Sequence, residues 1–379
     1  MQLFLLIFFS ALSHSAFIGC RVTVSLYAIH LHGTPFTIGT LIALFGLLPM
    51  LISVAVGRLI DRLGGRVPML AGTLIVFVGI LLPSLIPGVA TLYVACPLIG
   101  LGFIGCHLSV QNMVGFIGNA EDRPAHFSHL ATAQAAAAFS GPMLAGISID
   151  LIGYGSTFAI LALLPLASAA AIATNMLKLP PPRRLPILHA SKARPTDLLE
   201  DRDLRSVFIV TGMHAVAWEL FSFMTPIYGS QIGLSASAIG VIMASFAMAA
   251  VMVRVVLPLL TRRITTWRLL KETMLLAALV YAVFPFTAQF EMLMALAFML
   301  GMALGGSQPM VMTLLHDAAP EGRTGEAVGL RATIVTAGQT SLPLIFGAIG
   351  STLGVMTAFG SVALALALGS RMMRRRRIS

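Results

Sequence analysis

The chain has 379 residues, of which 58% are hydrophobic and only 10% are charged, and its mean hydropathy is +0.94. Soluble domains carry about 25% charged residues, so this composition excludes a water-soluble protein. The formal net charge of +10 would suit a nucleic-acid partner, but the positions of the basic residues indicate membrane topology instead, and no nucleic-acid binding is expected.

Apolar stretches fill most of the sequence. A membrane-spanning helix needs about 20 apolar residues, and about twelve such stretches follow one another, at residues 3–29, 36–57, 68–87, 90–117, 128–150, 155–178, 206–232, 235–260, 267–288, 291–316, 326–350 and 352–371. We therefore expect an all-α membrane protein with twelve transmembrane helices. A secretory signal peptide is the competing interpretation of the first stretch, but no basic segment precedes it.

Basic residues lie almost entirely on one side of these stretches. Of the 24 Lys and Arg residues, 21 gather in or beside alternate loops and at the C-terminal tail, and the other three, Arg21, Arg254 and Arg331, fall within predicted spans. Because Lys and Arg are retained on the cytoplasmic side, both termini are expected in the cytoplasm. The pattern predicts a multi-pass protein of a bacterial cytoplasmic (inner) membrane, whose basic loops face the lipid head groups.

A short charged hairpin separates the second and third stretches. Its sequence from Gly57 to Arg66 is Gly-Arg-Leu-Ile-Asp-Arg-Leu-Gly-Gly-Arg. Within it, Gly57, Asp61, Arg62, Gly64 and Arg66 resemble the signature that the major facilitator superfamily carries between helices 2 and 3. The resemblance implies the fold of that family, in which two six-helix halves enclose a cavity lined by helices 1, 4, 7 and 10.

The resemblance also implies a gate at the cytoplasmic ends of the helices. Asp61 would cap the positive end of the eleventh helix, in the opposite half, near Arg331. Arg254, in the inner third of the eighth helix, would join this network through Glu326 or Asp317. Such contacts would hold the cytoplasmic side closed. The alternative is that these charges only fix the topology.

The second half of the sequence repeats the first with a shift of 201 residues. The shift superposes Tyr27 on Tyr228, Gly39 on Gly240, Gly100 on Gly301, Gly105 on Gly306, Pro142 on Pro343, Gly146 on Gly347 and Gly153 on Gly354. It predicts two parallel six-helix halves, as in facilitator transporters. The halves would comprise residues 1–178 and 206–371, with a cytoplasmic linker at 179–205 and a basic cytoplasmic tail at 372–379.

The fifth stretch contains an element that bears on the direction of transport. Gly141, Pro142 and Gly146 resemble the Gly-Pro element of antiport-type exporters in the facilitator family. This resemblance favours export of a small organic compound, and proton-coupled uptake of a nutrient is the alternative. The sequence contains no phosphate-binding Gly-x-x-x-x-Gly-Lys-[Ser/Thr] loop for ATP. We therefore expect a proton gradient to drive transport, and we expect no cofactor or metal.

Two charged residues within predicted spans are the main candidates for the binding and coupling site. A charge in the bilayer interior costs at least about 2.5–3.5 kcal/mol, so each needs a partner or a water-filled cavity. Arg21 in the first span would attract an anionic group of the substrate, and Glu219 in the seventh would titrate or pair with Arg21. A permanent ion pair that clamps the two helices is the alternative.

Uncharged polar residues in the spans complete the candidate site. His14 and His107 are candidate proton carriers, or histidines bonded to a backbone carbonyl. Gln111 and Gln308 are candidate hydrogen-bonding groups for the substrate. An integral-membrane enzyme remains a weaker alternative, since the histidines are scattered singly and suggest no catalytic or metal-binding set. We expect a monomeric transporter, not an enzyme, whose partners are a small-molecule substrate and membrane lipids.

Overall fold

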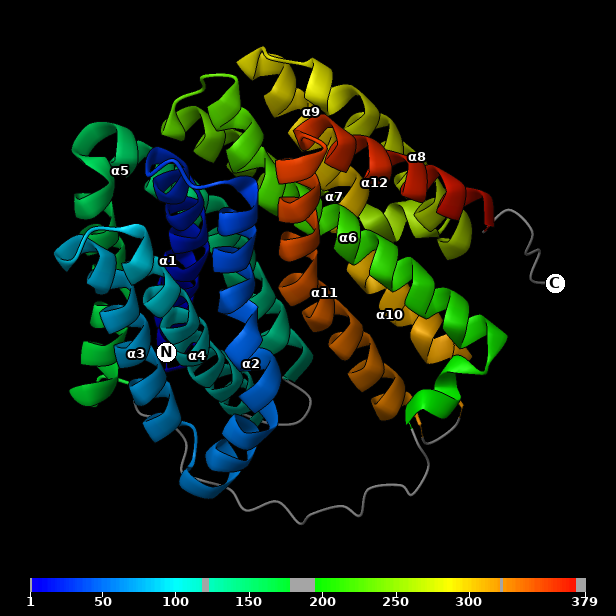
Figure 1. Ribbon diagram of the computed structural model, residues 1–379. Helices are drawn as coiled ribbons and strands as arrows, with labels where there is room; N and C mark the ends of the chain where they lie inside the picture. The colour runs from blue at the N-terminus through cyan, green and yellow to red at the C-terminus, as the bar shows by residue number, and fades with distance from the viewer. Residues whose placement is uncertain (1, 118–122, 178–194, 321–322, 373–379) are drawn as a thin grey trace.

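The computed structural model describes residues 2–117, 123–177, 195–320 and 323–372, which are almost entirely helical and contain no strand. The helices are α1 (Gln2–His30), α2 (Pro35–Leu63), α3 (Arg66–Leu85), α4 (Val89–Phe116), α5 (Arg123–Ala173), α6 (Arg202–Gln231), α7 (Ala236–Thr261), α8 (Thr266–Val283), α9 (Phe290–Gly305), α10 (Ser307–Ala318), α11 (Thr324–Thr352) and α12 (Val355–Met372) (Figure 1). Two short 3-10 helices are η2 (Pro195–Leu199) and η3 (Phe284–Phe286).

Ten of the described helical segments are long and apolar enough to cross a membrane, and Val355–Arg371 is a shorter apolar helix. One of the ten covers residues 125–173, and its backbone is not helical at Gly153. Gly153 divides α5 into two arms, which correspond to the fifth and sixth predicted spans. The tenth predicted span is interrupted at Gly306, between α9 and α10. The all-α membrane fold is confirmed, and the count of twelve crossings stays a prediction.

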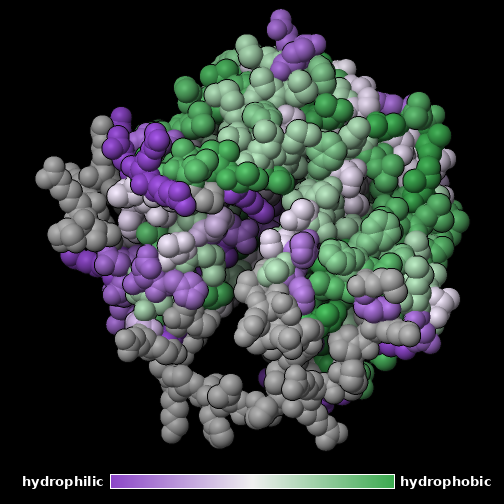
Figure 2. All heavy atoms as spheres, turned by 180° about the vertical axis from the view of Figure 1, so that it is seen from behind, coloured by the Kyte–Doolittle hydropathy of each residue, from purple (hydrophilic) through white to green (hydrophobic). Residues whose placement is uncertain are grey.

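The outside of the molecule is largely apolar. Large side chains such as Leu85, Leu151 and Val255 are about two-thirds exposed or more, and hydrophobic residues cover wide areas of the face shown in Figure 2. Soluble monomers rarely expose apolar patches beyond a few hundred square ångströms. The exposed side chains therefore indicate contact with lipid, and the chain is a multi-pass membrane protein.

The 201-residue repeat is visible in the backbone. Gly153 and Gly354 both have positive φ angles, of 76° and 86°. Thr34 and Ser235, which the same shift relates, are the N-cap residues of α2 and α7. Each side chain accepts a hydrogen bond of 3.2 Å from the backbone N–H three residues further on. Equivalent sequence positions therefore begin and end equivalent helices.

The two halves meet along two helix pairs that the repeat also relates, α2 with α11 and α5 with α7. At Gly39 in the first pair and Gly240 in the second, an added β-carbon would collide with the backbone of the opposite helix. Gly39 lies against Pro343 and Gly347, and Gly240 lies against Pro142 and Gly146. Small residues let membrane helices approach closely, which explains why the repeat is strongest in glycine and proline.

The halves converge at one end of the molecule and diverge at the other (Figure 1). We call the end where α2 and α7 begin the closed end, and the end where α2 ends and α11 begins the open end. Of the predicted linker 179–205, residues 179–194 lie outside the described residues, as do 373–379 of the predicted tail. The described remainder of the linker forms η2 and the start of α6. The boundaries of the two halves stay a prediction.

Two contacts between the halves lie at the closed end. The carboxylate of Asp150, on α5, accepts hydrogen bonds from the backbone N–H groups of Ala236 and Ser237, at 3.1 and 2.8 Å. The hydroxyl of Ser351, on α11, accepts one from the backbone N–H of Phe36, at 2.9 Å. The shift of 201 residues relates the two contacts, and each one holds the first turn of a helix in the opposite half.

Candidate functional site

Three adjoining cavities have volumes of about 120, 290 and 410 Å³, and Trp218 of α6 lines all three. We call them the first, second and third cavity in that order. The walls of the first and third cavities combine side chains of α1 and α5, in the first half, with side chains of α6 and α7, in the second. The residues that line the second cavity all belong to the second half, on α6, α7, α9, α10 and α11. Figure 2 shows a hollow between the halves, with hydrophilic residues in its depth.

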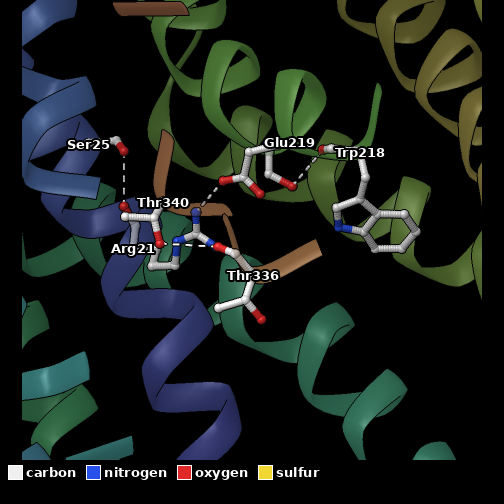
Figure 3. A network of polar contacts seen from close by, with 7 residues as sticks. Arg21, Ser25, Trp218, Glu219, Thr336 and Thr340 are labelled. Carbon is white, nitrogen blue, oxygen red and sulfur yellow. Dashed lines mark hydrogen bonds and ion pairs between the residues drawn. The ribbon is translucent and has the colours of Figure 1, made fainter. Parts of the chain in front are cut away.

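The predicted pair of Arg21 and Glu219 is formed. Nη2 of Arg21, on α1, lies 2.6 Å from Oε1 of Glu219, on α6, and the side chains are 24% and 2% exposed. Figure 3 shows Arg21 extending from α1 to this carboxylate, while the indole of Trp218 points to another side of α6. Arg21 lines the first cavity and Glu219 the second. The ion pair thus joins the two halves beside both cavities.

Arg254 and Arg331, which the sequence assigned to a gate, line the second cavity. Nε of Arg254 donates to the carbonyl oxygen of Gly305 at 3.2 Å. Nε of Arg331 is buried and has no hydrogen-bond partner among the described residues. Neither arginine forms an ion pair with a carboxylate of the described residues, Asp317 included.

The remainder of the gate prediction depends on side chains that are not described. The side chains of Asp61 and Glu326 lie outside the described residues. The predicted capping of α11 by Asp61, and the predicted link from Arg254 to Glu326, therefore stay predictions. In the present conformation the halves diverge at this end of the molecule (Figure 1).

The other residues of the charged hairpin lie on the first half. Gly64 ends α2 with a φ of 77°, a conformation that favours glycine. Nη2 of Arg66 donates to the carbonyl oxygen of Ile172, at the end of α5, at 3.1 Å. Arg62 is exposed, and a β-carbon at Gly57 would have no neighbour within 4 Å. The hairpin is thus anchored to its own half through Arg66.

The candidate histidines lie together on the first half. The ring of His14 lies 6.0 Å from that of His107 and 5.2 Å from that of Phe103, measured between centroids. His14 lines the third cavity. Gln111 is exposed, and its Nε2 lies 3.0 Å from Nε2 of His107. Gln308 lines both the second and the third cavity, so His14 and Gln308 are the two members of this group at the cavity walls.

The Gly-Pro element of α5 packs against two different helices. A β-carbon at Gly141 would lie 2.7 Å from the carbonyl oxygen of Ser15 on α1. Gly146 is in similarly close contact with the backbone of Ala236, at the start of α7 in the other half. Pro142 lies between them and lines the first cavity. The element therefore brings α1, α5 and α7 together next to the cavity.

Several residues of the site were missed by sequence reasoning. Gln134 and Gln339 line the third and second cavities, and amides within apolar spans were the signal that could have identified them. Asp150 and Ser351 were also missed. Their relation through the 201-residue shift was the available signal for these two, together with the N-cap residues that precede the helices they hold.

A helical membrane protein in which two repeated halves enclose a polar cavity has the architecture of a secondary transporter. The profile of the Major Facilitator Superfamily matches residues 3–291 and 271–377. The chain belongs to this family, as the hairpin motif predicted. The family consists of transporters, so the integral-membrane enzyme is no longer an alternative. No curated protein matches the sequence.

Solved transporter structures share this fold. One is a POT family transporter in complex with a thioalcohol-conjugated peptide, with a TM-score of 0.80, 15% identity, and 98% of this chain and 95% of that chain covered. A POT family transporter in complex with 5-aminolevulinic acid has a TM-score of 0.80 at 14% identity, with the same coverage. A variant of the nucleoside transporter NupG has a TM-score of 0.79 at 13% identity, covering 98% and 100%. At these identities the likeness shows a shared fold.

Proposed function

We propose that this protein moves a small organic solute across a bacterial cytoplasmic membrane by alternating access, as a monomer, and that it is a proton-coupled exporter. The observation that carries the proposal is the cavity itself. Both halves line the first and third cavities, the halves diverge at the open end, and repeat-related contacts hold them together at the closed end. Rocking of the halves about such a site is how transporters with internal repeats work.

The distribution of basic residues supports assigning the open end to the cytoplasm. The hairpin at Gly57–Arg66 and the described part of the linker, residues 195–205, lie at this end, and Lys and Arg are retained on the cytoplasmic side. Both termini are then cytoplasmic, and the conformation is inward-facing. A solute that enters from the cytoplasm into this conformation takes the first step of export. The Gly-Pro element of α5 supports the same direction, and proton-coupled uptake of a nutrient is the second candidate.

The pair of Arg21 and Glu219 is our candidate for the coupling element. It is the ion pair that links α1 to α6, and both partners border a cavity. Protonation of Glu219 would remove its negative charge and weaken the tie between the halves. Binding of a proton would thereby favour one conformation over the other. His14, at the wall of the third cavity, is a second candidate proton carrier.

Flux through purified protein in proteoliposomes tests this proposal. We expect movement of a metabolite that depends on an imposed pH gradient, and loss of that movement in Arg21→Ala and in Glu219→Gln. Full activity of both variants would remove the pair from the mechanism. Accumulation of a compound inside a deletion strain would support export, whereas failure of the strain to take up a compound would support import.

A further inference from the structure

We infer that the solute carries an oxyanion group, such as a carboxylate, and that Arg254 and Arg331 bind it in the second cavity. This inference rests on the proposed transport function and names the substrate class of the same site. Sequence reasoning had given the anionic group to Arg21. The charge of Arg21, however, is compensated by Glu219 at 2.6 Å, so Arg21 has less positive charge to offer a substrate.

Arg254 and Arg331 have no such compensation. They come from α7 and α11 and line one cavity of about 290 Å³. Within the described part of the chain, neither forms an ion pair with a carboxylate, and Nε of Arg331 is buried without a hydrogen-bond partner. A buried N–H without a partner is costly. Guanidinium groups present donors in a planar fork that matches a carboxylate or another oxyanion, so an anionic solute would satisfy both arginines.

The other walls of the second cavity fit the same ligand. Nε2 of His214, a residue that is 6% exposed, also lacks a hydrogen-bond partner in the described structure, while Gln308 and Gln339 offer amide N–H groups. Trp218 and Val335 provide an apolar wall for the body of the solute. Among the described side chains that line the three cavities, three are arginines and one is a carboxylate. The three cavities taken together therefore carry a net positive charge.

The sign of this potential can be measured with a cysteine placed in the cavity. Gln308 is exposed at the wall of two cavities, whereas the native Cys20, Cys96 and Cys106 are all buried. In a Gln308→Cys variant in detergent, we compare the rates of modification by a sulfonate-bearing and a trimethylammonium-bearing methanethiosulfonate. A charged cleft can enrich counter-ions by about tenfold or more. We expect the ratio of the anionic to the cationic modification rate to be about tenfold higher at Gln308→Cys than for a free thiol in solution.

Removing either arginine should reduce that preference. Arg254→Gln and Arg331→Gln, each in the Gln308→Cys background, are expected to lower the rate ratio severalfold, and Arg254→Lys and Arg331→Lys are expected to retain it. Arg268→Gln is the matched control, because Arg268 is exposed at the start of α8. Size-exclusion profiles exclude misfolded variants. A ratio equal to that of a free thiol, or equal effects of Arg268→Gln and Arg331→Gln, would overturn the inference.

Transport measured with Gln308 in place, in the parent protein and in the arginine variants, separates this inference from the proposed function. Proton-dependent flux together with a free-thiol ratio would reject the oxyanion site and leave the transporter in place. If the thiol assay shows preference for the anionic reagent but the protein exchanges no anion across vesicle membranes, the proposed transport function is rejected, and with it the inference that depends on it. Exchange of benzoate but not of the neutral isostere benzamide, with loss in Arg331→Gln, would support both.

Discussion

Asp150 offers the sharpest test of alternating access, because its contact joins the two halves only while the closed end is closed. Its carboxylate accepts two backbone N–H groups at the start of α7, at 3.1 and 2.8 Å. Removal of a capping side chain costs about 0.5–2 kcal/mol, and a carboxylate near a helix N-terminus contributes about 0.3–1 kcal/mol through its charge. Asp150→Ala should therefore cost about 1 kcal/mol in this conformation, which shifts the ratio of the two conformations about fivefold.

Double electron–electron resonance can measure that shift. Spin labels at Ile86→Cys and Ala288→Cys would report the separation of the halves at the closed end, since both positions are exposed in loops there and the native cysteines are buried. We expect Asp150→Ala to raise the population with a long label distance about fivefold, relative to the parent. Glu291→Ala is the control, because Glu291 is exposed at the same end. An unchanged distance distribution, or an equal change in the control, would refute the reasoning.

Three further predictions address packing, coupling and the gate. Gly240→Val should destabilise the protein by about 1–3 kcal/mol in thermal unfolding, since a backbone oxygen of α5 lies 2.5 Å from the new β-carbon; an equal loss in Gly360→Ala, which has open space, would contradict this. Loss of one partner of a buried ion pair costs about 3–5 kcal/mol, so the double variant Arg21→Met, Glu219→Leu should be more stable than either single variant. We expect its transport to be uncoupled from protons. Proton-driven flux in the double variant would show that the pair only clamps the two helices. Asp61→Asn should increase cysteine labelling at the open end, and unchanged labelling would leave Asp61 with a role in topology.

The fold could be predicted from the sequence because its close contacts accept few residue types. A helix pair as close as α2 with α11 tolerates only a glycine at Gly39, and the same holds for Gly240 in the other pair. Both positions therefore keep their glycine in the two repeats. The break at Gly153 was predictable for a related reason, since a positive φ there favours glycine. The interruption at Gly306 was missed, although Gly305, Gly306 and Pro309 supplied helix-breaking residues at that point.

The site was harder to predict, because it depends on which helices face each other. The position of Arg254 along its helix indicates its depth in the membrane, but its contact with a cavity depends on which neighbouring helices this side of α7 faces. Pairing of Arg21 with Glu219 could be predicted, since two opposite charges in apolar spans each need a partner. The contact of Asp150 could not, because a carboxylate at the end of a span resembles a solvated helix end, and its partner lies 86 residues away.

The two contacts at the closed end occupy equivalent positions but differ in chemistry. One is a carboxylate at a helix terminus and the other is a neutral hydroxyl. Dissolved ions screen the first strongly and the second hardly at all. The flank formed by α5 and α7 should thus weaken as ionic strength rises, while the flank formed by α2 and α11 holds. At high ionic strength, a molecule built from two similar halves would then begin to open between α5 and α7, while α2 and α11 stay in contact.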